Sequence, residues 1–141
     1  MEIDFQKCGG LVPAIIQDEC TGDVLMLGFM NSASLAETRR TGEVVFFSRS
    51  RNKLWKKGES SGHVLRVREM RVDCDADALL VRVEAVGPGV CHEGYRSCFF
   101  RKLEPDGNAV VIAHDRFAVH VTDEAGKASM AATIAGTLSC G

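Results

Sequence analysis

The chain has 141 residues, a net charge of −2 and 45% hydrophobic residues. These values are ordinary for one globular domain with its own core, and they argue against a protein that coats nucleic acid or an anionic membrane. The N-terminus lacks the charged and apolar segments of a signal peptide, and no apolar run approaches the roughly 18 residues of a membrane span. The expected compartment is therefore the cytoplasm.

Extended segments dominate the first part of the chain. Residues 11–18 and 24–30 are apolar and flank the turn signal Thr21-Gly22-Asp23, which predicts a pair of strands. Pro13 should lie at an edge or at a strand start, because proline lacks the N–H that a central ladder needs. Asn31 or Ser32 then provides the cap of a short helix over residues 35–40, which Thr41-Gly42 ends.

Further strand-like segments follow at residues 44–48, 64–72, 78–86, 97–103 and 110–113. Several of them have hairpin spacing, with a turn predicted at Pro105-Asp106-Gly107-Asn108. This pattern predicts an α+β fold with a mainly antiparallel sheet and few short helices. We assign residues 1–124 to one domain and expect residues 125–141, which are rich in small side chains, to form a weak helix or a loose tail.

The most informative segment is Asp73-Cys74-Asp75-Ala76-Asp77, between two strand-like stretches. If it is extended, the three carboxylates point to one face and the thiol to the other. Carboxylates in such a row repel one another unless a cation lies between them. Oxygen ligands suit magnesium, calcium or manganese, whereas thiolates suit zinc. The segment therefore predicts ligands for two kinds of metal.

Six cysteines permit a disulfide framework, but such frameworks belong mainly to small secreted domains. Ordinary thiols are expected at Cys8, Cys20 and Cys140. The other cysteines lie near aspartate, histidine or glycine, at Cys74, Cys91 and Cys98. Their spacing differs from that of a zinc ribbon, yet three protein ligands with an open fourth position are typical of a catalytic zinc.

Zinc held by three thiolates should be a weak Lewis acid, so we expect a base nearby. His92 follows Cys91 directly, and His63 lies in a glycine-flanked loop, so both are candidates for this base. Each histidine could instead be an ordinary one, either solvated or with its hydrogen bonds satisfied within the core. His114 and His120 have no comparable neighbours.

A second candidate site lies between residues 48 and 63, where five cations precede the first acid, Glu59. Cationic side chains, hydroxyls and amides exposed by glycine are suited to phosphate oxygens, and Trp55 could stack on a base or sugar. The residues proposed to bind substrate are Arg49, Arg51, Trp55, Lys57, Glu59, Ser60, Ser61 and Gly62. The alternative is a solvated charged loop with one half-buried tryptophan.

Three blocks together resemble the signature blocks of the phosphoribosyl-AMP cyclohydrolase family: residues 54–63, residues 73–80, and Cys91-His92 with Ser97-Cys98-Phe99. The resemblance runs from about residue 11 to residue 101 and includes several earlier segments. It implies hydrolytic opening of the adenine ring of N1-(5-phosphoribosyl)-AMP between N1 and C6, a step of histidine biosynthesis. The substrate is a small molecule, so neither nucleic acid nor membrane is an expected partner.

The resemblance also implies zinc, magnesium and a homodimer with the metal site at its interface. Carried over to this sequence, the magnesium ligands are Asp73, Asp75 and Asp77. Zinc would be bound by Cys74 of one subunit and by Cys91 and Cys98 of the other. Residues 87–90 look slightly expanded relative to the family, and no further family block follows Arg101.

Two other hypotheses remain open from the sequence. One is a zinc-stabilised module that binds nucleotides without turnover, with a ligand such as His92 closing a structural site. The other is a hydrolase on the same scaffold that acts on a different purine. Metal content and a turnover assay distinguish these hypotheses.

Overall fold

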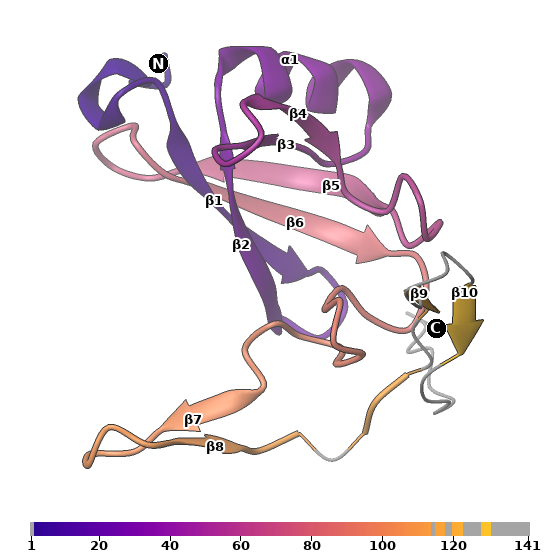
Figure 1. The fold of residues 1–141 in the computed structure, drawn as a ribbon. Helices are drawn as coiled ribbons and strands as arrows, with labels where there is room; N and C mark the ends of the chain where they lie inside the picture. Colours follow the sequence, from indigo (N-terminus) through magenta and orange to yellow (C-terminus); the bar gives the residue numbers. More distant parts are fainter. Residues whose placement is uncertain (1, 114, 118–119, 123–127, 131–141) are drawn as a thin grey trace.

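The main sheet of the protein has four strands in the order β2-β1-β6-β5 (Figure 1). The computed structural model describes residues 2–113, 115–117, 120–122 and 128–130. β1 pairs antiparallel with β2 and parallel with β6, while β5 pairs antiparallel with β6. The bounds of these strands are β1 Val12–Asp18, β2 Val24–Met30, β5 Leu65–Val72 and β6 Leu79–Ala85.

Shorter elements surround this sheet. The described residues also form the two-stranded pairs β3 (Val45–Ser48) with β4 (Lys53–Lys56), β7 (Arg101–Leu103) with β8 (Ala109–Val111), and β9 (His120–Thr122) with β10 (Ala128–Met130). The 3-10 helix η1 covers Gln6–Cys8, and the α-helix α1 covers Ser32–Thr41. None of the helices in these residues has the length and apolar character needed to cross a membrane.

Local sequence explains the first elements. β1 alternates buried and half-buried residues along its length, as a strand does when one face covers the core. Pro13 lies near the strand start and before the ladder with β6 begins at Ala14, so its missing N–H costs no bond there. The side chain of Asn31 accepts a hydrogen bond from the Ser34 amide, and Gly42 ends α1 in the left-handed conformation.

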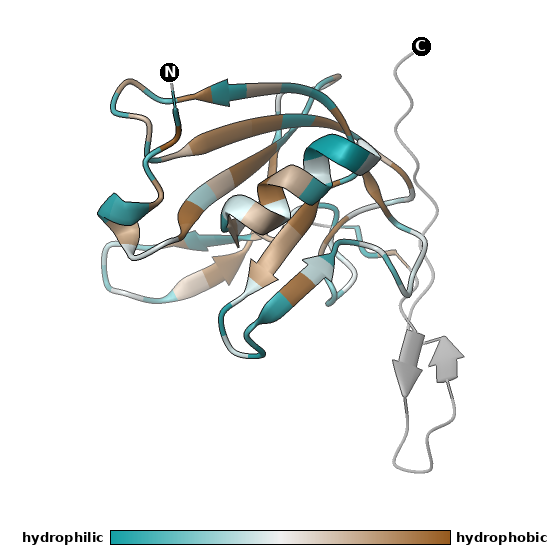
Figure 2. Ribbon diagram, turned by 90° about the horizontal axis from the view of Figure 1, so that it is seen from above, coloured by the Kyte–Doolittle hydropathy of each residue, from teal (hydrophilic) through white to brown (hydrophobic). Residues whose placement is uncertain are grey.

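The core lies between the sheet and the layer formed by α1 with β3. Ile16, Leu25, Phe46 and Leu65 are at most 1% exposed, and Figure 2 shows apolar strands beneath α1. Gly28 makes the close approach of β2 to β3 possible, because a Cβ there would lie 2.5 Å from the Phe46 ring. Burial of these side chains is the main favourable contribution to folding.

The α+β architecture with mainly antiparallel pairing is confirmed. The expectation of an extended segment at residues 73–77 is wrong, because these residues form the turn between β5 and β6. β4 was not expected: residues 53–56 were interpreted as part of a charged loop, but they pair with β3. Ala128–Met130 is a strand, whereas the remainder of the expected tail lies largely outside the described residues.

Candidate metal and substrate site

The β5–β6 turn brings three carboxylates together. One oxygen from each of Asp73, Asp75 and Asp77 lies within 4.8 Å of the others. Asp73 builds the turn itself, since its Oδ1 accepts hydrogen bonds from the amides of Asp77 and Ala78 at 2.9 and 3.1 Å. Ala76 adopts a φ of 63°, which a turn of this shape requires. A tight turn thus brings the carboxylates together. The sequence had predicted instead that an extended strand would align them on one face.

An ammonium group already lies against this cluster. The Nζ of Lys7, on η1, is 3.1 Å from Asp75 and 3.3 Å from Asp77. Lys7 lowers the pKa of Asp75, whereas desolvation, followed by the neighbouring Asp75, raises the pKa of Asp77. Three carboxylates this close together repel one another when all are ionised, so a cation among them is favourable. The donor set therefore fits a hard divalent ion such as magnesium.

A second donor set lies in the loop from Cys91 to Cys98. The Gly94 amide donates to the Cys91 carbonyl at 3.0 Å, and the Cys91 amide donates to the Tyr95 carbonyl at 3.1 Å. This tight turn folds the loop back so that Cys91 lies close enough to Cys98 to raise the pKa of its thiol. Cys91 is buried and Cys98 is exposed at the rim, and both are free thiols. Two adjacent thiols fit a soft ion such as zinc.

Lys57 lies beside this pair. Its Nζ donates to the Val90 carbonyl at 2.6 Å and lies 5.5 Å from the centre of the Trp55 ring. Burial lowers the pKa of Lys57, and the nearby Cys98 and Cys91 act in the opposite direction. Partial desolvation of the thiol within the loop, followed by the nearby Cys91, raises the pKa of Cys98 to about 11, although part of its surface stays accessible at the rim. In the absence of metal, Cys98 is therefore a protonated thiol at neutral pH.

Cys74 is remote from the other two cysteines within one chain. It lies in the turn that precedes β6, whereas Cys91 and Cys98 follow the far end of this strand (Figure 1). The strand Leu79–Ala85 alone spans about 20 Å at 3.3 Å per residue, many times the reach of a zinc ion. A zinc site with all three thiols therefore needs a second copy of the chain.

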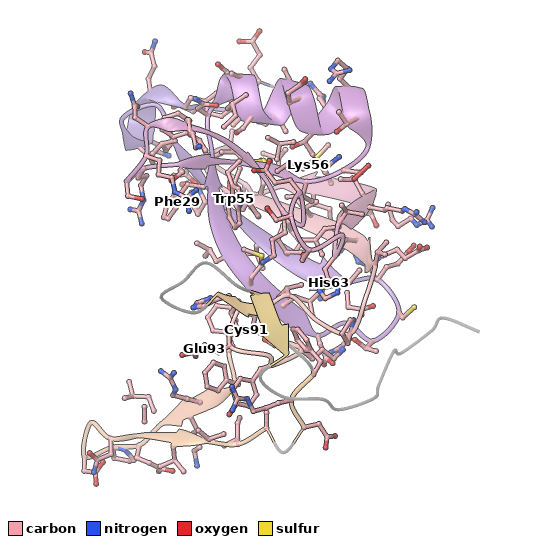
Figure 3. All side chains as sticks on the ribbon, turned by 45° about the vertical axis from the view of Figure 1, so that its right-hand side comes forward. Phe29, Trp55, Lys56, His63, Cys91 and Glu93 are labelled. Atoms are coloured by element: carbon pink, nitrogen blue, oxygen red, sulfur yellow. The ribbon has the colours of Figure 1, made fainter. Side chains whose placement is uncertain are left out.

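The two candidate histidines differ in their surroundings. The ring of His63 contacts the edge of Phe117 at 5.8 Å between centroids, and a Cβ on Gly87 would lie 2.6 Å from it. Figure 3 shows His63 between β4 and the turn that carries Cys91 and Glu93. His92 is exposed within that turn. His63 is thus packed against the segment that leads to Cys91, whereas His92 follows Cys91 directly and faces solvent.

The basic segment forms the β3–β4 hairpin and the loop after it. Within the described residues, Arg49, Arg51 and Lys53 have no carboxylate within ion-pair distance, and Arg49 stacks on the Phe29 ring at 3.9 Å. Trp55 packs on Phe46 with 5.7 Å between ring centroids, so part of its surface serves the core. Unpaired arginines and an accessible aromatic ring are compatible with a phosphorylated nucleotide.

The loop after β4 is shaped by its glycines. Gly58 has a φ of 83°, and a Cβ there would lie 2.4 Å from the His63 backbone. Gly62 also has a positive φ, and its amide donates to the Gly58 carbonyl at 2.8 Å. Glu59, Ser60 and Ser61 are exposed on this loop, and the Ser61 hydroxyl accepts from the His63 amide at 3.2 Å.

Several neighbours of the site were not expected from the sequence, namely Lys7, Phe29, Arg96 and Phe117. The position of Arg96 between two candidate zinc ligands in the sequence could have indicated that it lies near the site. Lys7 and Phe117 have no such sequence signal, because only the tertiary fold brings them to the site. Cys8 is an exposed free thiol, as expected. Cys20 is disulfide-bonded, so the expectation of an ordinary thiol is wrong there. Cys140 lies outside the described residues.

Comparison with known proteins places the chain in a family. The phosphoribosyl-AMP cyclohydrolase family model matches residues 26–100, which are 75 of the 141 residues. A protein of Solibacter usitatus named phosphoribosyl-AMP cyclohydrolase is 62% identical over 104 residues, or 74% of this chain and 82% of that protein.

Two further relatives carry the same name. One, from Desulforapulum autotrophicum, is 51% identical over 83% of this chain and 94% of its own length. Another, from Acidiphilium cryptum, is 59% identical over 70% of this chain and 84% of its own length. The matched residues include the basic segment, the aspartate turn and all three candidate zinc ligands. The chain therefore belongs to the phosphoribosyl-AMP cyclohydrolase family.

Proposed function

We propose that this protein is an enzyme that opens the adenine ring of N1-(5-phosphoribosyl)-AMP by hydrolysis of the bond between N1 and C6. The observation that carries the proposal is the presence of a carboxylate cluster and a thiol pair in a chain of this family. The unpaired cations of the β3–β4 hairpin provide contacts for the two phosphates of the substrate. Because such a doubly phosphorylated molecule does not cross membranes unaided, the cytoplasm is the proposed compartment.

Each metal has a separate donor set in this proposal. Asp73, Asp75 and Asp77 would hold magnesium, which orients phosphate oxygens. Cys91 and Cys98 would hold zinc together with Cys74 of the partner subunit, in a homodimer. A zinc ion held there would lower the pKa of a water molecule, which hydrolysis at neutral pH requires. His63 and His92 are the proposed candidates to hold or move the proton; His63 is fixed by packing, and His92 is in contact with solvent.

The decisive experiment combines a metal assay with turnover. Protein purified without chelator is expected to contain about one zinc per chain, since three thiolates form a tight site. Incubation with phosphoribosyl-AMP, zinc and magnesium should give the ring-opened product, followed by its absorbance. Tight zinc without turnover would favour a nucleotide-binding module, and turnover of another purine alone would favour a different hydrolase.

A test of the carboxylate cluster is Asp75→Asn. Because Asp75 contributes one charge to the cluster, we expect the magnesium concentration for half-maximal activity to rise about tenfold. The KM should rise as well, while zinc content stays unchanged. Asp106→Asn is the matched control, since Asp106 is an exposed turn aspartate whose side chain, among the residues that the structure describes, bonds only to Asn108. Equal magnesium dependence in both variants would make the Asp73–Asp77 turn purely structural.

Zinc binding should depend on pH in a defined direction. Because the pKa of Cys98 is raised to about 11, this thiol must lose its proton to become a ligand. Zinc affinity should therefore increase as pH rises from 6.5 to 8, by about tenfold per pH unit for each proton released. Calorimetry in two buffers of different ionisation enthalpy measures the proton count. Affinity that does not change with pH would contradict binding through Cys98.

A further inference from the structure

Arg96 fastens the loop that carries Cys91 and Cys98 to the β1–β2 turn. Its Nη2 lies 2.6 Å from Asp18 Oδ2 and donates to the Thr21 hydroxyl at 3.1 Å. Its Nη1 lies 2.5 Å from Asp23 Oδ2. One guanidinium thus contacts three residues of a single turn, a geometry that lysine cannot reproduce.

The backbone around Arg96 continues this attachment toward both thiols. The Arg96 carbonyl accepts a hydrogen bond from the Val90 amide at 3.1 Å, next to Cys91. On the other side, the Ser97 hydroxyl donates to the Val24 carbonyl at 2.8 Å, and the Cys98 amide donates to the Leu25 carbonyl at 2.7 Å. Arg96 is therefore linked through short paths to the backbone of each cysteine.

Burial makes this arrangement specific. The Asp18 side chain is 12% exposed and that of Arg96 is 28% exposed, so both are largely withdrawn from water. Removing the Arg96 guanidinium would leave the Asp18 carboxylate largely buried without a partner, at a cost in folding free energy. This cost favours one fixed geometry of the pair. Close packing adds to the constraint, because a Cβ on Gly89 would lie 2.5 Å from the Arg96 Cα.

From these contacts we infer that Arg96 is a positioning residue, which with Asp18 and Asp23 holds Cys91 and Cys98 at the separation that one metal ion requires. The inference rests on the proposed zinc site. Residues outside the ligand set that fix the orientation of ligands commonly affect metal affinity by 10- to 100-fold. Arg96 has no role in contacting substrate in this proposal.

The test uses the full chain and the variant Arg96→Gln. We expect zinc affinity, measured against a chromophoric chelator, to fall by about 10- to 100-fold. The thiolate-to-metal absorption of the Co²⁺-substituted protein should weaken or shift, because the two sulfurs no longer have a fixed separation. Arg96→Lys, which keeps the charge but loses the fork geometry, should recover part of the affinity.

Arg82→Gln is the matched control. Arg82 is 24% exposed and also bridges a carboxylate, of Glu69 at 3.2 Å, and a backbone carbonyl, of Glu19 at 3.3 Å, but it is not attached to the cysteine loop. Its zinc affinity should stay within about twofold of the wild type. If Arg96→Gln lowers the melting temperature but keeps the wild-type zinc affinity and Co²⁺ spectrum, Arg96 is merely structural and the inference is wrong.

Asp23→Asn keeps the inference testable if Arg96→Gln does not fold. The Asp23 side chain is 58% exposed, so its substitution leaves no buried charge, and zinc affinity should fall about threefold. Unchanged affinity in that variant would overturn the inference. Wild-type protein without thiolate-to-Co²⁺ absorption would instead refute the zinc site itself, and the inference with it.

Discussion

Cys98→Ser should abolish turnover and remove zinc from the protein. Serine keeps the shape of the side chain but replaces a soft thiolate with a hydroxyl, which is a poor zinc ligand. We expect activity to fall by at least about 100-fold and zinc content to approach zero. Both are measured on the same preparation, by metal analysis and by product absorbance. The fold should persist, because Cys98 lies at the rim of its loop.

Cys8→Ser is the matched control for this prediction. Cys8 is likewise an exposed free thiol, but it lies in the 3-10 helix η1 and is not one of the assigned zinc ligands. Its substitution should leave both zinc content and turnover unchanged. Equal zinc loss from the two variants would show that zinc is not bound through the assigned ligand.

Mixing two inactive variants should restore activity. In a dimer of Cys74→Ser with Cys98→Ser, one of the two sites combines intact Cys91 and Cys98 from one chain with intact Cys74 from the other. Random reassociation gives half mixed dimers with one intact site each, so about one quarter of wild-type activity is expected. Sharing of ligands between subunits is expected because the length of β6 separates Cys74 from the other two thiols within one chain. The assay is turnover after the two chains are refolded together.

The control mixture combines Cys91→Ser with Cys98→Ser. These two residues lie in one loop of one chain, so every site in any dimer lacks one of them. No activity should return in this mixture. Restoration in the control, or none in the Cys74→Ser and Cys98→Ser mixture, would contradict the sharing of ligands between subunits.

The elements with strong local signals were predicted from the sequence. β1 and β2 have a strongly apolar pattern, and α1 has a capping side chain at its start and a glycine at its end. The structure confirms all three elements, with small differences in where they begin and end. β4 was missed because its sequence, Lys53-Leu54-Trp55-Lys56, is dominated by charge, and its strand conformation depends on pairing with β3.

The aspartate segment was predicted as a metal-binding group for a reason that the structure corrects. Alternation along a strand was expected to sort carboxylates and thiol onto opposite faces. Instead, Asp73 folds the segment into a turn by accepting two backbone amides, and Ala76 adopts a left-handed conformation. Aspartate commonly bonds to the backbone a few residues ahead, so the turn is as consistent with these residue types as the strand was.

By itself, the sequence determined the family, the α+β class and the residue types able to bind a hard and a soft metal, because these depend on local pattern and on the chemistry of single side chains. Only the tertiary structure decided which of those residues meet. It placed Lys7 on the carboxylates, Lys57 beside the thiol pair and Arg96 on the β1–β2 turn. It also separated Cys74 from Cys91 and Cys98 by the length of β6, since a strand is rigid and extended whatever the sequence distance between its ends.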